Sequence, residues 1–124
     1  VGMPELHKLT PYLGVLQNRG HKVALLTDGR MSGASGKVLA AIQVSPEAAD
    51  GGLIGKIRTG DLIRIDTASG TLQAESDDDS IDSRPLQHPD LTASHNGMGR
   101  ELFTAFRQQV SSAESGGTIF PPPV

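Results

Sequence analysis

The chain has 124 residues, of which 36% are hydrophobic and 3% aromatic, and its formal net charge is −3. This length fits one domain, with a core built from Val, Leu, Ile and Ala rather than from aromatic rings. The acidic balance, with no dense Lys/Arg patch and few stacking side chains, argues against nucleic-acid binding. The sequence has no cysteine, which excludes disulfides and any iron–sulfur cluster held by thiolates of this chain.

No apolar run approaches the roughly 20 residues needed to cross a bilayer, and no secretory signal is visible at the start. We therefore expect a soluble protein without a membrane partner. The chain starts at Val1 and enters a motif-like segment at once, which indicates a piece of a longer protein. Its 15 Gly and 8 Pro imply many turns and favour a mixed, β-rich fold with few helices.

The first part of the chain predicts a helix followed by two buried strands. Residues 4–19 are expected to be helical in two pieces, because Pro11 disfavours helix at the residue before it. Gly20 is expected to end the second piece in the left-handed conformation. The apolar runs then predict a strand over 22–27 and another apolar element over 38–42.

The middle of the chain predicts a short helix and a β-meander. Ser45 is a candidate N-cap with Pro46 at the first helical position, and this helix should stop near Gly51. Alternating polar and apolar residues then predict short strands. The strands are expected at 54–58, 61–67 and 71–75.

The last third predicts a solvated connection and one helix. Residues 77–90 carry five Asp and two Pro, which favours an exposed connection ordered in part by docking. A helix over 99–113 has an apolar face that is expected to dock on the sheet. That face comprises Leu102, Phe103, Phe106 and Val110. An extended tail is expected over 114–124.

The segment Thr27-Asp-Gly-Arg-Met-Ser-Gly-Ala-Ser-Gly-Lys37 combines hydroxyls, charges and three glycines directly after an apolar strand. Such a loop is either a ligand site or only a tight turn. It is not a phosphate-binding P-loop, because no hydroxyl follows Lys37. The glycine spacing also excludes the dinucleotide fingerprint, and the residues around Ser32 do not match a hydrolase nucleophile elbow.

Two segments together resemble the dihydroxyacid and phosphogluconate dehydratase family. They are Gly2-Met-Pro-Glu-Leu-His-Lys-Leu-Thr-Pro11 and the loop over 27–37, and Gly99-Arg-Glu-Leu-Phe103 adds to the likeness with the phosphogluconate branch. The resemblance extends to about Phe120. It implies that residues 1–120 form the family's C-terminal domain, with residues 121–124 as a tail. The implied fold is α/β, mixed and β-rich, a swivelling β-barrel-like β/β/α domain with flanking helices.

The resemblance also implies a function. A dehydratase of the phosphogluconate branch converts 6-phospho-D-gluconate to 2-keto-3-deoxy-6-phosphogluconate and water in Entner–Doudoroff gluconate breakdown. The implied cofactors are an iron–sulfur cluster of the 4Fe-4S type, with ligands in an N-terminal domain outside this chain, and a divalent ion such as Mg²⁺. A cytoplasmic homodimer is also implied. The alternatives are a dehydratase of another sugar acid or of branched-chain dihydroxy acids, and a non-catalytic binding domain of the same fold.

By match to the family, Ser32 takes the position of the catalytic base and Glu5 that of a carboxylate ligand to the divalent ion. Without the resemblance, Glu5 reads as an acid in the first turn of a helix. A serine of ordinary acidity is a poor base at neutral pH, so Ser32 needs a positive local field. Arg30 and the backbone N–H groups of Gly33 and Ala34 are the candidates for that field.

Two further positions in and near the loop are candidates for substrate contact. Asp28 is expected either to orient Arg30 or bind a substrate hydroxyl, or simply to form a turn, and Gly29 lets the backbone approach a substrate oxygen. Arg100, in the segment that opens the last predicted helix, is a possible phosphate-binding residue, although helix capping explains that segment equally well. The four histidines show no metal-ligand spacing.

Overall fold

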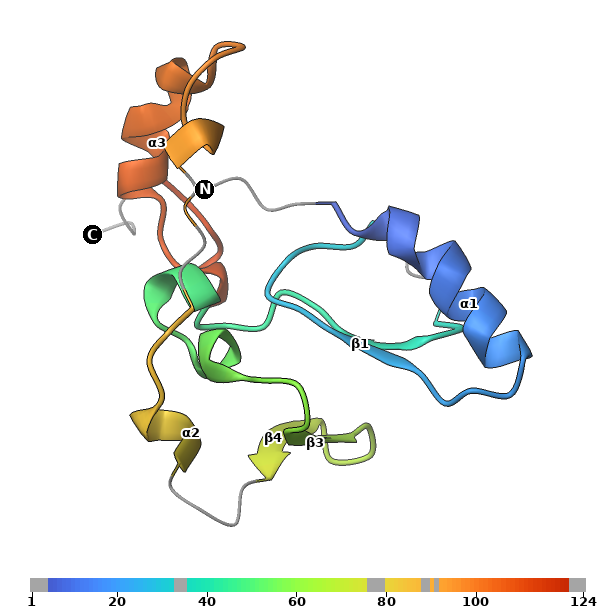
Figure 1. Cartoon of the computed structure of the whole chain (residues 1–124). Helices are drawn as coiled ribbons and strands as arrows, with labels where there is room; N and C mark the ends of the chain where they lie inside the picture. Colours follow the sequence, from blue (N-terminus) through green and yellow to red (C-terminus); the bar gives the residue numbers. More distant parts are fainter. Residues whose placement is uncertain (1–4, 33–35, 76–79, 88–89, 91, 121–124) are drawn as a thin grey trace.

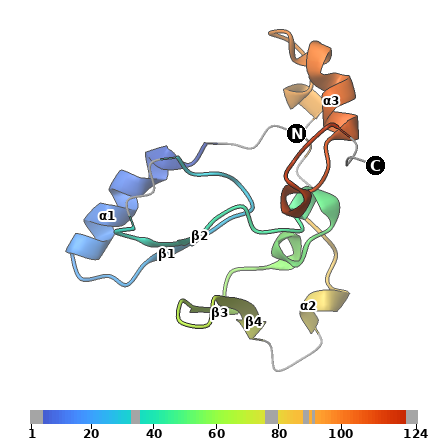
Figure 2. The same ribbon diagram turned by 180° about the vertical axis from the view of Figure 1, so that it is seen from behind.

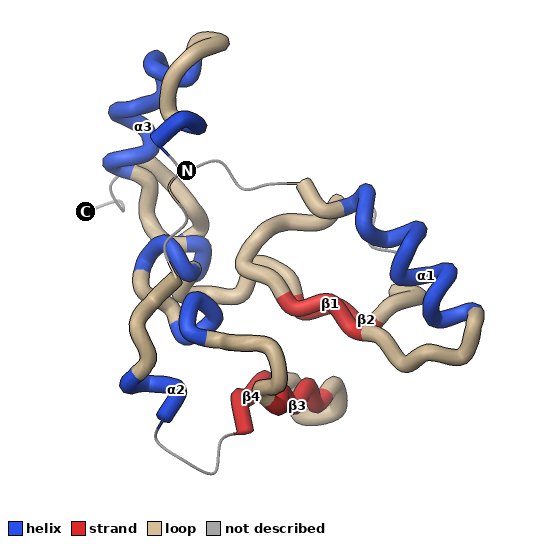
Figure 3. Tube along the Cα trace, in the orientation of Figure 1, coloured by secondary structure: helices blue, strands red, loops and turns tan. Residues whose placement is uncertain are grey.

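The structure is a computed structural model, and it describes residues 5–32, 36–75, 80–87, 90 and 92–120. Short helices and strands are joined by long loops (Figures 1 and 3). Helix α1 (Thr10–Asn18) with strands β1 (Ala24–Leu26) and β2 (Leu39–Ala41) forms one side of the molecule, and α3 (Thr104–Gln109) lies on the other side in both views (Figures 1 and 2). The hairpin of β3 (Leu62–Asp66) and β4 (Thr71–Glu75) lies apart from the first strand pair.

The first helical segment is in two pieces, as predicted, but the break does not fall at Thr10, which is helical with φ −55° and ψ −44°. A 3₁₀ turn, η1 (His7–Leu9), leads directly into α1 (Thr10–Asn18), which has Pro11 in its first turn. Proline is tolerated there because the first N–H groups of a helix have no partner within it. Gly20 follows the C-cap with φ +90°, and its N–H donates to the carbonyl of Gln17 at 3.0 Å. The sharp end of α1 therefore depends on a glycine.

Strands β1 (Ala24–Leu26) and β2 (Leu39–Ala41) confirm the two predicted apolar elements, although each is shorter than expected. They run parallel, with Leu25 opposite Ala40. The loop over 27–37 therefore leaves the end of β1 and returns the chain to the start of β2. The carbonyl of Thr27 accepts from the amide of Val44 at 3.2 Å, which extends the contact beyond the strands.

The segment after β2 departs from the prediction in two ways. The short helix near Ser45 is a 3₁₀ turn, η2 (Ala48–Asp50), with Glu47 rather than Ser45 at its N-cap. The expected strand over 54–58 is wrong, because residues Leu53–Lys56 form another 3₁₀ turn, η3. A Cβ on Gly55 would lie 3.0 Å from Leu86 and 3.2 Å from Ala48, so glycine permits a close approach here. A short apolar run alone does not separate a turn of this kind from a strand.

The hairpin of β3 (Leu62–Asp66) and β4 (Thr71–Glu75) confirms the other two predicted strands. Its turn is ordered by Asp66, whose Oδ1 accepts from the amides of Ala68 at 2.8 Å and Ser69 at 3.2 Å. These hydrogen bonds from Ser69 and Ala68 lower the pKa of Asp66. Gly70 completes the turn with φ +68°.

The acidic connection is ordered by docking where the structure describes it. Helix α2 (Ser80–Ser83) buries Ile81, which is 5% exposed. Arg84 then pairs with Asp61 at 2.6 Å, and the Arg58 amide donates to the same Asp61 oxygen at 2.7 Å. The rest of the predicted connection, residues 77–79 and 88–89, lies outside the described residues.

The last helix is shorter than predicted and does not dock on a sheet. After the short turn η4 (Thr92–Ser94) come a 3₁₀ turn, η5 (Arg100–Phe103), α3 (Thr104–Gln109) and η6 (Ala113–Ser115). The predicted docking face is exposed instead: Leu102 by 73%, Phe103 by 54%, Phe106 by 46% and Val110 by 48%. The spacing of apolar residues identifies the apolar face of a helix, but it does not show which element covers that face. Neither strand pair lies next to α3 in either view.

The predicted α/β class is confirmed, since helices and strands are mixed along the chain. In the described part the strands make two separate pairs and no closed barrel. The accessible surface is 9238 Å², against about 6,300 Å² for a folded monomer of this mass. Among the described apolar side chains only Met31, Val38 and Ile81 are buried. Much apolar surface is thus left for contacts outside this chain.

Candidate active site

Glu5 and Ser32 meet although they are far apart in the sequence. Glu5 Oε1 accepts a hydrogen bond from the backbone N–H of Ser32 at 2.8 Å. Beside it, Glu5 forms a parallel β-bridge with Arg30, and the Leu6 amide donates to the Arg30 carbonyl at 3.1 Å. The residues before α1 are therefore fastened along the loop. The two residues that the family match singles out, Ser32 and Glu5, belong to one cluster.

The Glu5 carboxylate is surrounded by donors and a cation. Oε1 also accepts from the His7 amide at 3.0 Å, and the His7 Nδ1 lies 3.6 Å away. Oε2 lies 3.6 Å from Arg30 Nε. The Ser32 amide, followed by the His7 amide, the Ser32 hydroxyl and the Arg30 charge, lowers the pKa of Glu5 against the opposing effect of desolvation. Glu5 is thus held as a carboxylate at neutral pH.

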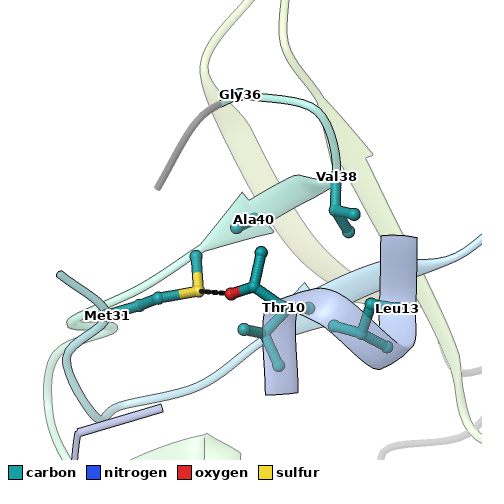
Figure 4. Close-up of a pocket in the computed structure, with 7 residues that line it drawn as sticks. Thr10, Leu13, Met31, Gly36, Val38 and Ala40 are labelled. Atoms are coloured by element: carbon teal, nitrogen blue, oxygen red, sulfur yellow. Dashed lines mark hydrogen bonds between the residues drawn. The ribbon is translucent and has the colours of Figure 1, made fainter. Parts of the chain in front are cut away.

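Met31 anchors the loop between two exposed neighbours. Its side chain is 8% exposed and lies in a small apolar pocket with Leu13, Val38 and Ala40 (Figure 4). The Thr10 hydroxyl donates to the Met31 sulfur at 3.2 Å, as Figure 4 shows. Arg30 and Ser32, on either side, are exposed. Burial of Met31 against α1 therefore turns Ser32 toward the surface.

Asp28 and Gly29 have structural contacts. Asp28 Oδ2 accepts from the Ala48 amide at 2.9 Å, at the start of η2. The Gly29 amide donates to the Thr27 hydroxyl at 2.9 Å, and its carbonyl accepts from Gln43 at 2.9 Å. These contacts favour the turn-forming alternative for Asp28. Gly33 and Ala34, the proposed oxyanion donors, lie outside the described residues.

Arg100 does not join this cluster. Its Nη1 contacts the Asn96 carbonyl at 3.4 Å, and its own carbonyl accepts from Arg107 at 2.9 Å. The nearby Gly97 amide already donates to the Glu101 carboxylate at 2.6 Å. The turn that carries Arg100 leads into α3, away from α1 and the loop in both views (Figures 1 and 2). Of the sequence-predicted residues, the structure brings together Glu5, Arg30 and Ser32.

An open groove beside Ser32 was not foreseen. It is lined by His7, Ser32 and Lys37 and by residues along one face of α1. The Gln17 side chain donates to the Lys37 carbonyl at 2.6 Å and joins the end of the loop to α1. Lys37 drew attention in the sequence only as part of a failed P-loop match. The i, i+4 spacing of Thr10, Gly14 and Asn18 was the available signal for a helix face.

The described residues form no complete metal site. No group of three His, Cys, Asp or Glu side chains gathers among them. Glu5 Oε2 is the oxygen best placed for a hard divalent ion, which needs several further oxygen ligands and would compete with Arg30. An iron–sulfur cluster does not fit this chain, which has no thiolate to bind it.

The family profile described as "Dihydroxy-acid/6-phosphogluconate dehydratase C-terminal" matches residues 1–117. The chain belongs to the dihydroxy-acid/6-phosphogluconate dehydratase family. It is 56% identical over 118 residues to a phosphogluconate dehydratase of Rhizobium meliloti, covering 95% of this chain and 20% of that protein. It is 58% identical over 115 residues to a phosphogluconate dehydratase of Zymomonas mobilis, covering 93% of this chain and 19% of that protein.

A more distant member of the dehydratase family is the dihydroxy-acid dehydratase of Wolinella succinogenes. It is 38% identical over 119 residues, which cover 95% of this chain and 20% of that protein. The chain thus spans about a fifth of the length of these relatives. In the part of the chain that the structure describes, no helix is long and apolar enough to cross a membrane.

Proposed function

We propose that this chain is the C-terminal part of a hydro-lyase that dehydrates 6-phospho-D-gluconate to 2-keto-3-deoxy-6-phosphogluconate. The observation that carries the proposal is the identity of 56 to 58% with proteins named phosphogluconate dehydratase, against 38% with one named dihydroxy-acid dehydratase. The joining of Glu5 to Ser32 supports it, because two residues matched separately to the family motif lie in one cluster.

In the proposed reaction a proton leaves the carbon beside the carboxylate, and the hydroxyl of the next carbon leaves as water. The resulting enol becomes the 2-keto acid. We propose that Ser32 Oγ accepts that proton, and the exposure of Ser32 beside an open groove supports this role. Met31, buried between the loop and α1, holds Ser32 in position. A positioned base contributes about 10² to 10⁴-fold to the rate of such a step.

The Glu5 charge has an effect on this base. A carboxylate beside Ser32 disfavours a serine alkoxide, so a cation must offset it. Arg30 does so in part, with its Nε 3.6 Å from Glu5 Oε2. Gly33 and Ala34 remain the proposed backbone donors of the loop. Glu5 Oε2 would hold the divalent ion in the assembled protein. When bound, the ion and the cluster would supply Lewis-acid chemistry at substrate oxygens.

Several features of the complete protein belong to the same proposal. Residues 1–120 would act as one domain with a swivelling, barrel-like arrangement, in which the two strand pairs are completed by contacts that this chain does not make alone. The other domain of the protein would supply the cysteines of a 4Fe-4S cluster. We also propose a cytoplasmic homodimer. The exposed apolar face of α3 supports a chain that has further contacts.

The test is keto-acid formation by the full-length protein, purified without oxygen. The protein is offered 6-phosphogluconate, unphosphorylated gluconate and a branched-chain dihydroxy acid at matched concentrations. We expect the highest kcat/KM for 6-phosphogluconate. A higher value for either competitor would assign the chain to another dehydratase, and no turnover of any would favour a binding domain. The isolated chain is expected to be inactive, and turnover by it would contradict the cluster-dependent reaction.

A further inference from the structure

The groove beside Ser32 follows the length of α1. Its wall is formed by Thr10, Pro11, Gly14, Val15 and Asn18 of the helix, with His7, Ser32 and Lys37 completing it, and its volume is about 540 Å³. This volume lies within the range of small-molecule sites. A helix of this length extends for about 12 Å, because each residue adds about 1.5 Å. The groove is therefore long enough for an extended six-carbon acid.

Gly14 keeps this groove open. It lies in the interior of α1, where glycine is less favourable than alanine. It lines the groove, and a Cβ built on it would meet no atom of the described residues within 4 Å. Packing within the described residues therefore does not require glycine at this position. A side chain there would instead take up space in the groove.

The groove is polarised between its ends. The Glu5 carboxylate adjoins Ser32 and His7, whereas no acidic residue among those that the structure describes lines the groove itself. Lys37 is held at its backbone by Gln17 and is followed by the buried Val38, while its side chain is exposed. Its ammonium forms no ion pair with any residue that the structure describes. The phosphate, the more highly charged end of the substrate, is therefore favoured near Lys37, whereas a carboxylate near Ser32 needs the cation that offsets Glu5.

We propose that the groove along α1 holds the carbon chain of the substrate and that the Lys37 ammonium binds its phosphate. This inference rests on the proposed function. The reaction places the carbon beside the carboxylate at Ser32, and the phosphate is at the other end of the carbon chain. Lys37 is the cation that lines the groove together with Ser32, whereas Arg100 lies with α3 and outside the groove. Lys37 thereby selects phosphorylated over unphosphorylated acids.

The test uses the full-length enzyme with Lys37→Met, the conservative Lys37→Arg and the control Lys22→Met, which removes an exposed lysine outside the groove. We expect Lys37→Met to raise KM for 6-phosphogluconate at least about tenfold, as for a lost charge-assisted contact. Lys37→Arg should restore part of the affinity, and Lys22→Met should match wild type. With gluconate, KM should change by less than about threefold in each of these three lysine variants.

A second readout does not need turnover. Inorganic phosphate binding, measured by calorimetry, should weaken in Lys37→Met and not in Lys22→Met. Gly14→Ala should raise KM for both substrates and leave phosphate binding unchanged, because it narrows the groove without removing the charge. An unchanged KM for 6-phosphogluconate and an unchanged phosphate affinity in Lys37→Met would overturn the proposal. It would also be overturned if Lys37→Met raised KM equally for gluconate, or if Arg100→Ala raised KM for 6-phosphogluconate more than Lys37→Met does. Wild-type enzyme that binds phosphate through Lys37 but does not dehydrate 6-phosphogluconate would refute the proposed function alone.

Discussion

The Glu5 carboxylate accepts a hydrogen bond from the Ser32 amide at 2.8 Å, across 27 positions of the sequence. This contact fastens the segment before α1 to the loop after β1. It also sets a negative charge beside the hydroxyl that we propose as the base. The position of Ser32 and the cation requirement of the site therefore both follow from Glu5.

The Glu5 contact predicts slow exchange of the Ser32 amide. In Glu5→Ala the amide loses its acceptor, so its hydrogen exchange should accelerate by about tenfold or more, while Glu5→Gln should keep part of the protection. Glu114→Ala, at an exposed glutamate in η6, is the matched control. The measurement is hydrogen exchange followed by NMR at neutral pH. Equal exchange in Glu5→Ala and wild type would show that the contact is not formed in solution.

The Asp61–Arg84 ion pair predicts a pH-dependent contribution to stability. The Arg84 side chain first, and then the Arg58 amide, lowers the pKa of Asp61 below its ordinary value of 3.8. A lowered carboxyl pKa stabilises the fold above the unfolded-state value, and this contribution is lost as the pH falls through the folded-state pKa. Asp61→Asn should therefore destabilise the chain at pH 7 and, to the same extent, at about pH 5.

The difference between Asp61→Asn and wild type should shrink as the pH falls below 3.8 and through the lower folded-state pKa, because the wild-type carboxylate then also becomes protonated. Urea midpoints followed by circular dichroism give the comparison. Asp82→Asn serves as the control, because it is the backbone carbonyl of Asp82 that accepts from Lys56. A difference that stays constant down to pH 2 would mean that the pair contributes through packing rather than charge.

The burial of Met31 predicts that substitutions in the pocket against α1 lower the free energy of unfolding more than substitutions of exposed apolar residues do. Met31→Ala removes a buried side chain from the pocket against α1 and should cost about 2 kcal/mol. Leu102→Ala removes a side chain that is 73% exposed and should cost about 0.5 kcal/mol or less. The free energy of unfolding of the 124-residue chain is the quantity to compare. Equal costs would mean that Leu102, in η5, is packed in solution.

Asp28 is predicted to stabilise η2 rather than to bind substrate. Asp28→Ala leaves the Ala48 amide without its carboxylate partner and should cost about 1 kcal/mol, as for a lost N-cap. In the full-length enzyme, kcat should be nearly unchanged and Asp28→Asn should recover much of the stability. A large loss of kcat without a loss of stability would instead assign Asp28 to the substrate.

The local signals of the sequence identified most elements near the site. Pro11 and Gly20 marked the start and end of α1, and the apolar runs marked β1 and β2. The strand expected over 54–58 was wrong, because the approach of Gly55 to Leu86 is a tertiary contact that the apolar run does not encode. The prediction that the last helix docks on the sheet was wrong, because the spacing of apolar residues does not show which element covers the apolar face of a helix.

For the site, the motif match singled out Glu5 and Ser32, and nothing in the sequence showed that they touch. The groove was missed for the same reason. Its walls come from α1 and from Lys37, which Gln17 fastens to the helix only once both are folded.

The central claim is that Ser32 acts as the base of a 6-phosphogluconate dehydratase. Its most direct test is kcat for keto-acid formation from 6-phosphogluconate by full-length Ser32→Ala, purified without oxygen and matched to wild type in iron content. Ser69→Ala, in the turn of the β3–β4 hairpin, is the control. We predict a loss of at least about 10²-fold in Ser32→Ala and wild-type activity in the control. Full activity in Ser32→Ala would contradict the account.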